Sequence, residues 1–287
     1  MTQAIRTRTV RANDLEFGLL EAGSGPLALC LHGFPDCAHT WRHLLPALAD
    51  AGFHAVAPFM RGYAPTHVPA DSDYRLSTLA ADAVTLHEVL GGGSDAVLIG
   101  HDWGAETAYL AAAAVPDRWR RLVTLAVPPA GLDAVLFGDF EQLKRFWYIF
   151  MFRDPGDFAA GVVARDDLAL IGKLWRDWSP GFDASEHLAL VRDSLPAPEN
   201  LAAAIGYYRA AADGGAAVNG GAPTLAPQPT LYLHGAADGC IGVEFAASAG
   251  EFLAPDSRVV VVEAAGHFLQ VEQPAEVNRL ILDWITT

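Results

Sequence analysis

The stretch that decides the fold is residues 96–105, Ala-Val-Leu-Ile-Gly-His-Asp-Trp-Gly-Ala. Its first residues favour a buried strand, and the alanine-rich pattern that follows favours a helix. A Gly-x-Asp-x-Gly turn between strand and helix is typical of a nucleophile elbow, which projects its central side chain from the sheet. Asp102 is therefore the candidate nucleophile, and its alternative role is a simple cap on the following helix.

Short apolar runs alternate with helical patterns along the chain. Thr9–Val10 and Leu15–Leu20 favour an antiparallel pair, and the runs that favour buried strands are Leu27–Leu31, Phe53–Ala57, Ala96–Ile99, Leu122–Val127, Thr230–Leu233 and Val259–Val262. Helical spacing occurs in Trp41–Ala51, Leu76–Leu90, Ala105–Val115, Val243–Leu253 and Ala275–Trp284. The alternation predicts an α/β fold with a mostly parallel sheet covered by helices on both faces.

The alternation stops between Pro128 and about Gln228. This region is rich in aromatic residues and helical patterns and has no strand-like run. We expect it to form a helical cap over the carboxyl ends of the strands, where open α/β sheets place their sites. The expected division is a first core part at residues 1–129, a helical cap at 130–227 and a second core part at 228–287.

The composition excludes several classes of function. The 287 residues are 52% hydrophobic, and 19 basic against 34 acidic residues give a net charge of −15. Without a cluster of Lys or Arg, we expect neither a nucleic-acid nor a membrane partner. Cys30, Cys37 and Cys240 suggest no disulfide framework, and we find no signal peptide and no apolar run of about 18 residues, so we expect a cytoplasmic protein. The oligomeric state stays open.

Two later segments offer partners for Asp102. His267 stands between the last strand-like run and the last helix, which is the chain position of a general base in this order of residues. Asp238 follows the run Thr230–Leu233 and is the candidate acid that orients His267, with a turn-forming Asp-Gly as its alternative. We expect no metal, because His39 and His43 lack a third ligand in register.

The amides of Phe34 and Trp103 are the candidates for an oxyanion hole. Phe34 lies in the loop that follows the run Leu27–Leu31, and Trp103 follows the nucleophile directly. A carboxylate nucleophile can displace a leaving group from saturated carbon, which forms an ester on Asp102 itself. Water activated by His267 then hydrolyses that ester, so this chemistry disfavours an esterase or lipase.

With these motifs the sequence resembles the epoxide hydrolases of the α/β-hydrolase fold, whose sheet has eight strands. The resemblance rests on His32-Gly33-Phe34-Pro35, Gly100-His101-Asp102-Trp103-Gly104-Ala105, Asp238 and Gly266-His267. It covers residues 5–129 and 228–287 and extends into the cap. The loop Phe59–Thr66 departs from the family pattern, because it keeps Arg-Gly-Tyr but lacks the aspartate, second glycine and serine around it.

The resemblance implies a cofactor-independent hydrolase in which two cap tyrosines polarise the epoxide oxygen. Tyr148 and Tyr208 stand at the matching places, and aromatic packing within the cap is the alternative role for both. We expect Trp147, Phe152 and Tyr207 to line an apolar substrate pocket, although Trp147 or Tyr207 could replace its neighbouring tyrosine. The predicted substrate is a small apolar epoxide, aryl or alkyl.

Other functions share much of this pattern. Haloalkane and haloacetate dehalogenases have the same triad, and Trp103 could donate its indole N–H to a halide. However, Phe34 stands where many haloalkane dehalogenases have asparagine, and Glu106 would repel the carboxylate of a haloacetate. An ester or lactone hydrolase and a non-catalytic small-molecule-binding protein of the same fold also remain open.

Overall fold

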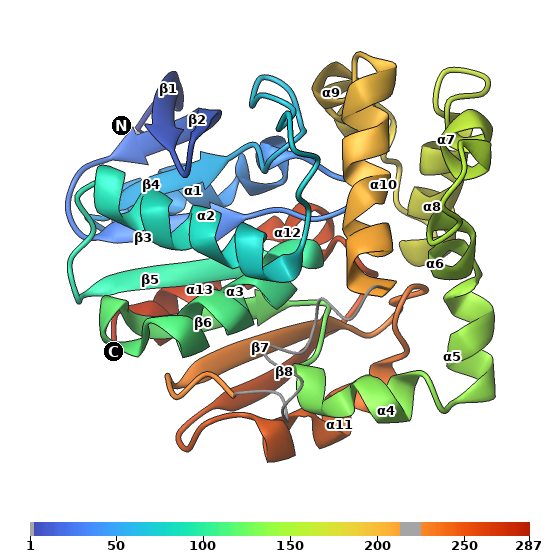
Figure 1. Ribbon diagram of the computed structural model, residues 1–287. Coiled ribbons are helices and arrows are strands. Elements are labelled where there is room, and N and C mark those ends of the chain that lie inside the picture. The colour runs from blue at the N-terminus through green and yellow to red at the C-terminus, as the bar shows by residue number, and fades with distance from the viewer. Residues whose placement is uncertain (1–2, 213–224) are drawn as a thin grey trace.

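The computed structural model describes residues 3–212 and 225–287 (Figure 1). Its sheet has eight strands in the order β1-β2-β4-β3-β5-β6-β7-β8. The strands are β1 (Arg6–Ala12), β2 (Leu15–Gly23), β3 (Leu27–Leu31), β4 (His54–Pro58), β5 (Ala96–His101), β6 (Trp119–Leu125), β7 (Thr230–Gly235) and β8 (Arg258–Val262). Pairing is antiparallel from β1 to β4 and parallel from there to β8, which confirms the predicted fold class.

Helices cover both faces of this sheet. In Figure 1, α2 (Leu76–Val89) and α3 (Trp103–Ala114) lie in front of the sheet, whereas α1 (Leu44–Asp50) and α13 (Pro274–Ile285) lie behind it. Every residue of β3 and β5 is buried, as expected for parallel strands that are packed on both faces. The nucleophile turn between β5 and α3 therefore starts from one of the most enclosed strands of the core.

Two predicted helices differ from those in the structure. The expected helix Val243–Leu253 consists of a 3₁₀ turn (Val243–Phe245), α11 (Ala246–Ala249) and a second 3₁₀ turn (Gly250–Phe252), where a glycine weakens helical propensity. The expected helix Trp41–Ala51 is present but begins three residues late, as α1 from Leu44, after a 3₁₀ turn (Ala38–Trp41). Pro46 fits in α1 because it lies in the first turn.

The described secondary structure between β6 and β7 is entirely helical and forms the cap. It comprises a 3₁₀ turn (Ala130–Leu132) and the helices α4 (Asp133–Leu136), α5 (Phe140–Arg145), α6 (Trp147–Phe152), α7 (Phe158–Val163), α8 (Ala169–Trp178), α9 (Ser185–Ser194) and α10 (Pro198–Ala212). Figure 1 shows the cap helices α5–α10 standing together at one end of the sheet. No helix in the described ranges is long and apolar enough to cross a membrane.

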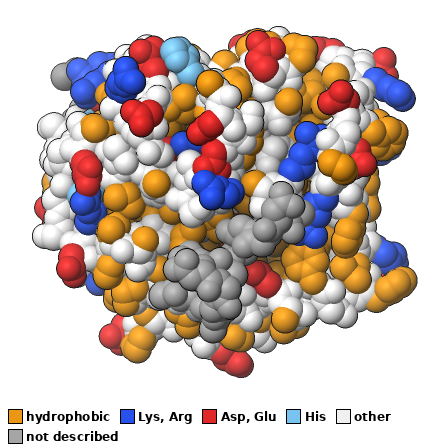
Figure 2. Space-filling view, viewed as in Figure 1, with side chains coloured by type: hydrophobic (Ala, Val, Ile, Leu, Met, Phe, Trp, Pro, Cys, Tyr) orange, Lys and Arg blue, Asp and Glu red, His pale blue; other side chains and the backbone are white. Residues whose placement is uncertain are grey.

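The outer side of the cap exposes aromatic side chains. Phe140, Trp147, Phe150 and Phe158 are each more than two fifths exposed. In the view of Figure 2, hydrophobic side chains gather over the cap helices at the right. The cap is therefore apolar outside as well as inside, so hydrophobicity alone does not tell which of its aromatic residues face the core.

Candidate active site

Asp102 is the single residue between the end of β5 and the start of α3. It has φ 53° and ψ −122°, a conformation that costs a non-glycine residue about 1–3 kcal/mol. Close packing of the turn maintains this strain, because a Cβ atom on Gly100 would overlap the Gly104 carbonyl, and one on Gly104 would overlap the Leu31 carbonyl. The two glycines thus let the turn pack tightly while Asp102 projects out of the sheet.

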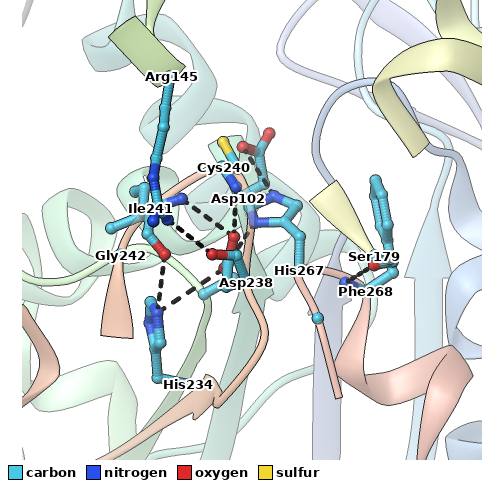
Figure 3. Close-up of polar contacts among 12 residues, drawn as sticks. Asp102, Arg145, Ser179, His234, Asp238, Cys240, Ile241, Gly242, His267 and Phe268 are labelled. Atoms are coloured by element: carbon cyan, nitrogen blue, oxygen red, sulfur yellow. Dashed lines mark hydrogen bonds and ion pairs between the residues drawn. The ribbon is translucent and has the colours of Figure 1, made fainter. Parts of the chain in front are cut away.

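The structure brings Asp102, Asp238 and His267 together from three separate loops (Figure 3). The His267 Nδ1 atom lies 3.0 Å from Asp238 Oδ2, and its Nε2 atom lies 3.6 Å from Asp102 Oδ2. All three side chains are buried, and His267 is fully enclosed. Since an ionised carboxylate only accepts, Nδ1 must donate to Asp238, which directs Nε2 toward Asp102.

Asp238 is held in place by backbone amides as well as by His267. Its Oδ1 atom accepts hydrogen bonds from the amides of Cys240 at 2.7 Å and Ile241 at 3.0 Å (Figure 3). Burial works to raise the pKa of Asp238, but the charge and hydrogen bond of His267 lower it below its ordinary value. Asp238 therefore stays ionised and orients the imidazole.

His267 takes its electrostatic character from the two carboxylates. Burial works to lower its pKa. The charge of Asp238, the hydrogen bonds to Asp102 and Asp238, and the charge of Asp102 act in the opposite direction and raise the pKa to about 10. In the free protein at neutral pH the imidazole is therefore protonated between two anions. Any reaction that neutralises Asp102 removes part of the interaction that holds this proton.

The loop after β3 contacts the nucleophile directly. The Phe34 amide donates to Asp102 Oδ1 at 2.7 Å, and a Cβ atom on Gly33 would overlap the Asp102 carboxylate. The cap steadies this loop, because the indole N–H of Trp175 in α8 donates to the Pro35 carbonyl at 2.9 Å. The Phe34 amide is thus held in direct contact with the Asp102 carboxylate.

The end of α8 also anchors the loop that carries His267. The His267 amide donates to the Trp178 carbonyl at 3.0 Å, and the Phe268 amide donates to Ser179 Oγ at 3.3 Å (Figure 3). Glu272 accepts bonds from both Ser179 Oγ and the Gly266 amide. The sequence offered no sign of this anchor, because the residues that form it have no common spacing.

The two expected cap tyrosines line the same cavity as Asp102, and their ring centroids lie 5.8 Å apart. The Tyr208 hydroxyl is buried and has no hydrogen-bond partner in the described part of the chain. The Tyr148 hydroxyl lies 3.3 Å from Cys240 Sγ. Burial raises both tyrosine pKa values well above their ordinary value, and the Asp102 charge adds to this, so both hydroxyls remain protonated donors.

A cavity of about 160 Å³ opens beside Asp102. Its polar lining includes Asp102, Tyr148, Tyr208, Glu106 and Asp133, and most of the remaining wall is apolar. An engineered cavity of about 150 Å³ holds a benzene molecule, so this space fits a small organic substrate. No group of three or more residues suited to holding a metal ion occurs among the described residues.

Known proteins resemble the chain over almost its full length. A family model described as alpha/beta hydrolase fold matches residues 26–274. Epoxide hydrolase A of Mycobacterium tuberculosis is 31% identical, with 97% of each chain covered, and epoxide hydrolase 2 of Siraitia grosvenorii is 31% identical, with 99% of each covered. The chain belongs to the epoxide hydrolase family of the α/β-hydrolase fold. The crystal structure of epoxide hydrolase A from Mycobacterium thermoresistibile agrees, with a TM-score of 0.83 at 28% identity over 98% of each chain.

Trp147, Phe152 and Tyr207 were expected to line the substrate pocket of this epoxide hydrolase, but none of them lines the cavity beside Asp102. Trp147 is 44% exposed, because it sits on the outer side of α6, whereas Tyr148 and Phe152, four residues apart, share the inner side. Phe152 packs against the rings of Phe34 and Tyr208. The Tyr207 hydroxyl donates to the Arg61 carbonyl at 2.8 Å, so Tyr207 points to the core and not to the cavity.

The loop that departs from the family pattern has a structural role. Arg61 forms two hydrogen bonds of 2.6 Å with Asp82 of α2, and both side chains are buried. Tyr207 binds the carbonyl of the same arginine. The epoxide hydrolase core thus keeps its Arg-Gly-Tyr element as a support for α10, on which Tyr208 lies.

A buried chain of polar contacts joins cap and core, and no sequence motif indicated it. His187 Nε2 of α9 lies 2.6 Å from Asp36 Oδ1, and Arg42 contacts His187 Nδ1 at 2.6 Å. Burial works to raise the pKa of Asp36, but His187 lowers it to about 2. Asp36 directly follows the Phe34-Pro35 turn, so an epoxide hydrolase motif is tied here to a cap residue 151 positions away.

Proposed function

We propose that this chain hydrolyses epoxides to vicinal diols through an ester on Asp102. The observation that supports this most is the placing of Asp102 between the Phe34 amide at 2.7 Å and His267 Nε2 at 3.6 Å, beside the free hydroxyl of Tyr208. Relatives named epoxide hydrolases match the chain over nearly all of its length.

In the first half-reaction, Asp102 attacks an epoxide carbon. Its Oδ1 atom accepts a hydrogen bond from the Phe34 amide, so Oδ2 is the oxygen available to attack. The carbon–oxygen bond of the ring breaks as the ester bond forms, and the ring oxygen takes a proton from Tyr208, with Tyr148 as a second donor. As the Asp102 charge is consumed, one cause of the high tyrosine pKa values disappears, which favours this proton transfer.

In the second half-reaction, His267 activates water. Because the ester on Asp102 carries no charge, the pKa of His267 falls, and the imidazolium passes its proton through solvent to the tyrosinate left by the first step. The neutral imidazole can then take a proton from water. The hydroxide attacks the ester carbonyl, and the amides of Phe34 and Trp103 stabilise the oxyanion. Collapse releases the diol and the Asp102 carboxylate and leaves His267 protonated, as it was in the free protein. One water is consumed in each cycle.

The cavity favours apolar substrates of modest size, aryl or alkyl epoxides. Its wall includes Leu136, Phe146 and Ile149, which stabilise apolar groups by excluding water. Carboxylates at Asp102, Glu106 and Asp133 disfavour anionic epoxides.

The test is to incubate the protein with styrene oxide, a long-chain aliphatic epoxide, a 1-haloalkane and chloroacetate, and to measure diol and halide together. Diol without halide, lost in Asp102→Ala, supports the proposal. Halide without diol would keep the aspartate nucleophile but make the protein a dehalogenase. Reversible binding without any ester on Asp102, even in His267→Gln, would indicate a non-catalytic binding protein.

A further inference from the structure

The cavity has a second polar region apart from the reacting centre. Glu106 lies on α3, four residues after Asp102 and therefore about 6 Å further along the helix axis. Asp133 is the first residue of α4 in the cap. Both carboxyl groups are half-buried and line the same cavity as Tyr148 and Tyr208, so core and cap each contribute one acid.

Neither carboxyl group forms a salt bridge or a side-chain hydrogen bond with another described residue. Burial raises the pKa of Glu106, and the charges of Asp133 and Asp102 raise it further, while burial raises that of Asp133. The basic residue in the described lining is Arg153, whose guanidinium lies over the Phe137 ring at 5.5 Å and pairs with neither acid. Because both acids line one cavity and neither is paired with a basic side chain among the described residues, their oxygens retain capacity to accept hydrogen bonds from a ligand.

The free hydroxyl of Tyr208 shows independently that this cavity is built for a ligand. It is 3% exposed, faces the cavity and has no partner among the described residues. A buried hydroxyl without a partner costs free energy that a bound ligand recovers. Unpaired polar groups thus stand at both regions of the cavity, with the apolar side chains of Leu136, Phe146 and Ile149 in the same wall.

We propose that Glu106 and Asp133 form a subsite that binds a hydrogen-bond donor, a hydroxyl or ammonium group, at the far end of an epoxide substrate. This inference rests on the proposed function and narrows its substrate class to short apolar epoxides with one terminal donor. The epoxide oxygen meets Tyr208 and Tyr148, the apolar chain lies along the wall, and the donor reaches the two acids. A terminal carboxylate is repelled at the same place.

The experiment compares substrates of equal heavy-atom count: 1,2-epoxyheptane, 5,6-epoxyhexan-1-ol and 5,6-epoxyhexan-1-amine. We expect the alcohol or the amine to exceed epoxyheptane in kcat/KM by about tenfold, the gain of one hydrogen bond to a charged acceptor. The ratio of kcat/KM for the alcohol or amine to kcat/KM for epoxyheptane falls to about one in Glu106→Leu and decreases in Asp133→Asn. The control is Asp157→Asn, an exposed cap acid outside the cavity, which keeps the ratio of the natural protein.

Binding to Asp102→Ala, measured by calorimetry with the same compounds, separates this inference from the proposed function. One outcome is that the natural protein forms no diol, yet Asp102→Ala binds the alcohol or the amine more tightly than epoxyheptane and loses this preference when Glu106→Leu is added. The subsite then stands and the proposed function fails. If diol forms but the ratio is near one in the natural protein, or persists in Glu106→Leu, the subsite is overturned. Preference for the amine or for the alcohol identifies which donor the subsite takes.

Discussion

The hydrolase core and the helical cap contribute to the site in different ways. Core residues such as Asp102, Asp238 and His267 follow strands whose ends are fixed by the sheet, and each is held by neighbouring backbone amides or by tight turns. Cap residues such as Tyr148 and Tyr208 take their direction from how short helices rotate against the core. The comparison shows that a local motif places a core side chain, whereas packing between distant segments places a cap side chain.

The strongest test of the core is the removal of its nucleophile. We expect Asp102→Ala to lower kcat/KM for epoxides by about 10⁴-fold or more, because no other carboxylate among the described residues contacts both the Phe34 amide and His267. Diol formation measured by chromatography checks this, with the melting temperature as the control for folding. Substantial residual turnover would show that the core does not supply the nucleophile.

A second change should divide the core mechanism into its two halves. We expect His267→Gln to slow turnover by about 10³-fold while leaving ester formation possible, since only the hydrolytic step needs a base. Intact-protein mass spectrometry should then show a mass increase equal to that of the epoxide. The absence of any adduct in this variant would argue against covalent catalysis.

The two cap tyrosines should differ in importance. We expect Tyr208→Phe to lower kcat by about 10²-fold and Tyr148→Phe by about tenfold. The Tyr208 hydroxyl has no hydrogen-bond partner within residues 3–212 and 225–287, whereas the Tyr148 hydroxyl contacts Cys240 Sγ. The matched control is Tyr207→Phe, whose hydroxyl binds the Arg61 carbonyl and should affect stability more than catalysis. The reverse order of effects would show that the cap presents Tyr148 to the substrate.

The connection between cap and core should contribute to stability. We expect His187→Phe to lower the free energy of unfolding by about 3 kcal/mol, because it leaves the buried Asp36 carboxylate without its cap partner. Chemical denaturation measures this, and His187→Gln, which keeps a donor, should lose less. Equal losses in both variants would mean that the hydrogen bond to Asp36 is not what stabilises the contact.

The smallest effect concerns the charge of the base. In Asp102→Asn one of the two anions around His267 is gone, so we expect the pKa of His267 to fall below about 10. Titration of the imidazole followed by nuclear magnetic resonance measures it directly, with Asp238→Asn expected to lower the pKa as well. An unchanged pKa in Asp102→Asn would remove the reason why ester formation prepares His267 to act as a base.

The fold was predictable because its signals are local and repeated. Alternating strand and helix patterns indicated the parallel sheet, and the structure confirms it, although β6 ends two residues early where Ala126 takes φ 67°. The cap was predictable as a helical region but not in detail. Trp147 was expected in the pocket but lies on the outer side of α6, and hydrophobicity does not distinguish the two sides of an apolar cap. Phe152 and Tyr207 are buried as expected, but contacts with distant residues direct Phe152 against the Phe34 ring and Tyr207 to the Arg61 carbonyl.

By itself, the sequence determined the parallel sheet, the glycine-lined turn around Asp102 and the chain order of Asp102, Asp238 and His267. These depend on side-chain patterns and backbone sterics within a few residues. Only the tertiary structure decided that the buried Tyr208 hydroxyl lacks a partner in the described part of the chain, that Tyr148 meets Cys240 and that Glu106 shares a cavity with Asp133. The reason is that such contacts join distant positions, and their geometry depends on how each helix rotates as it packs.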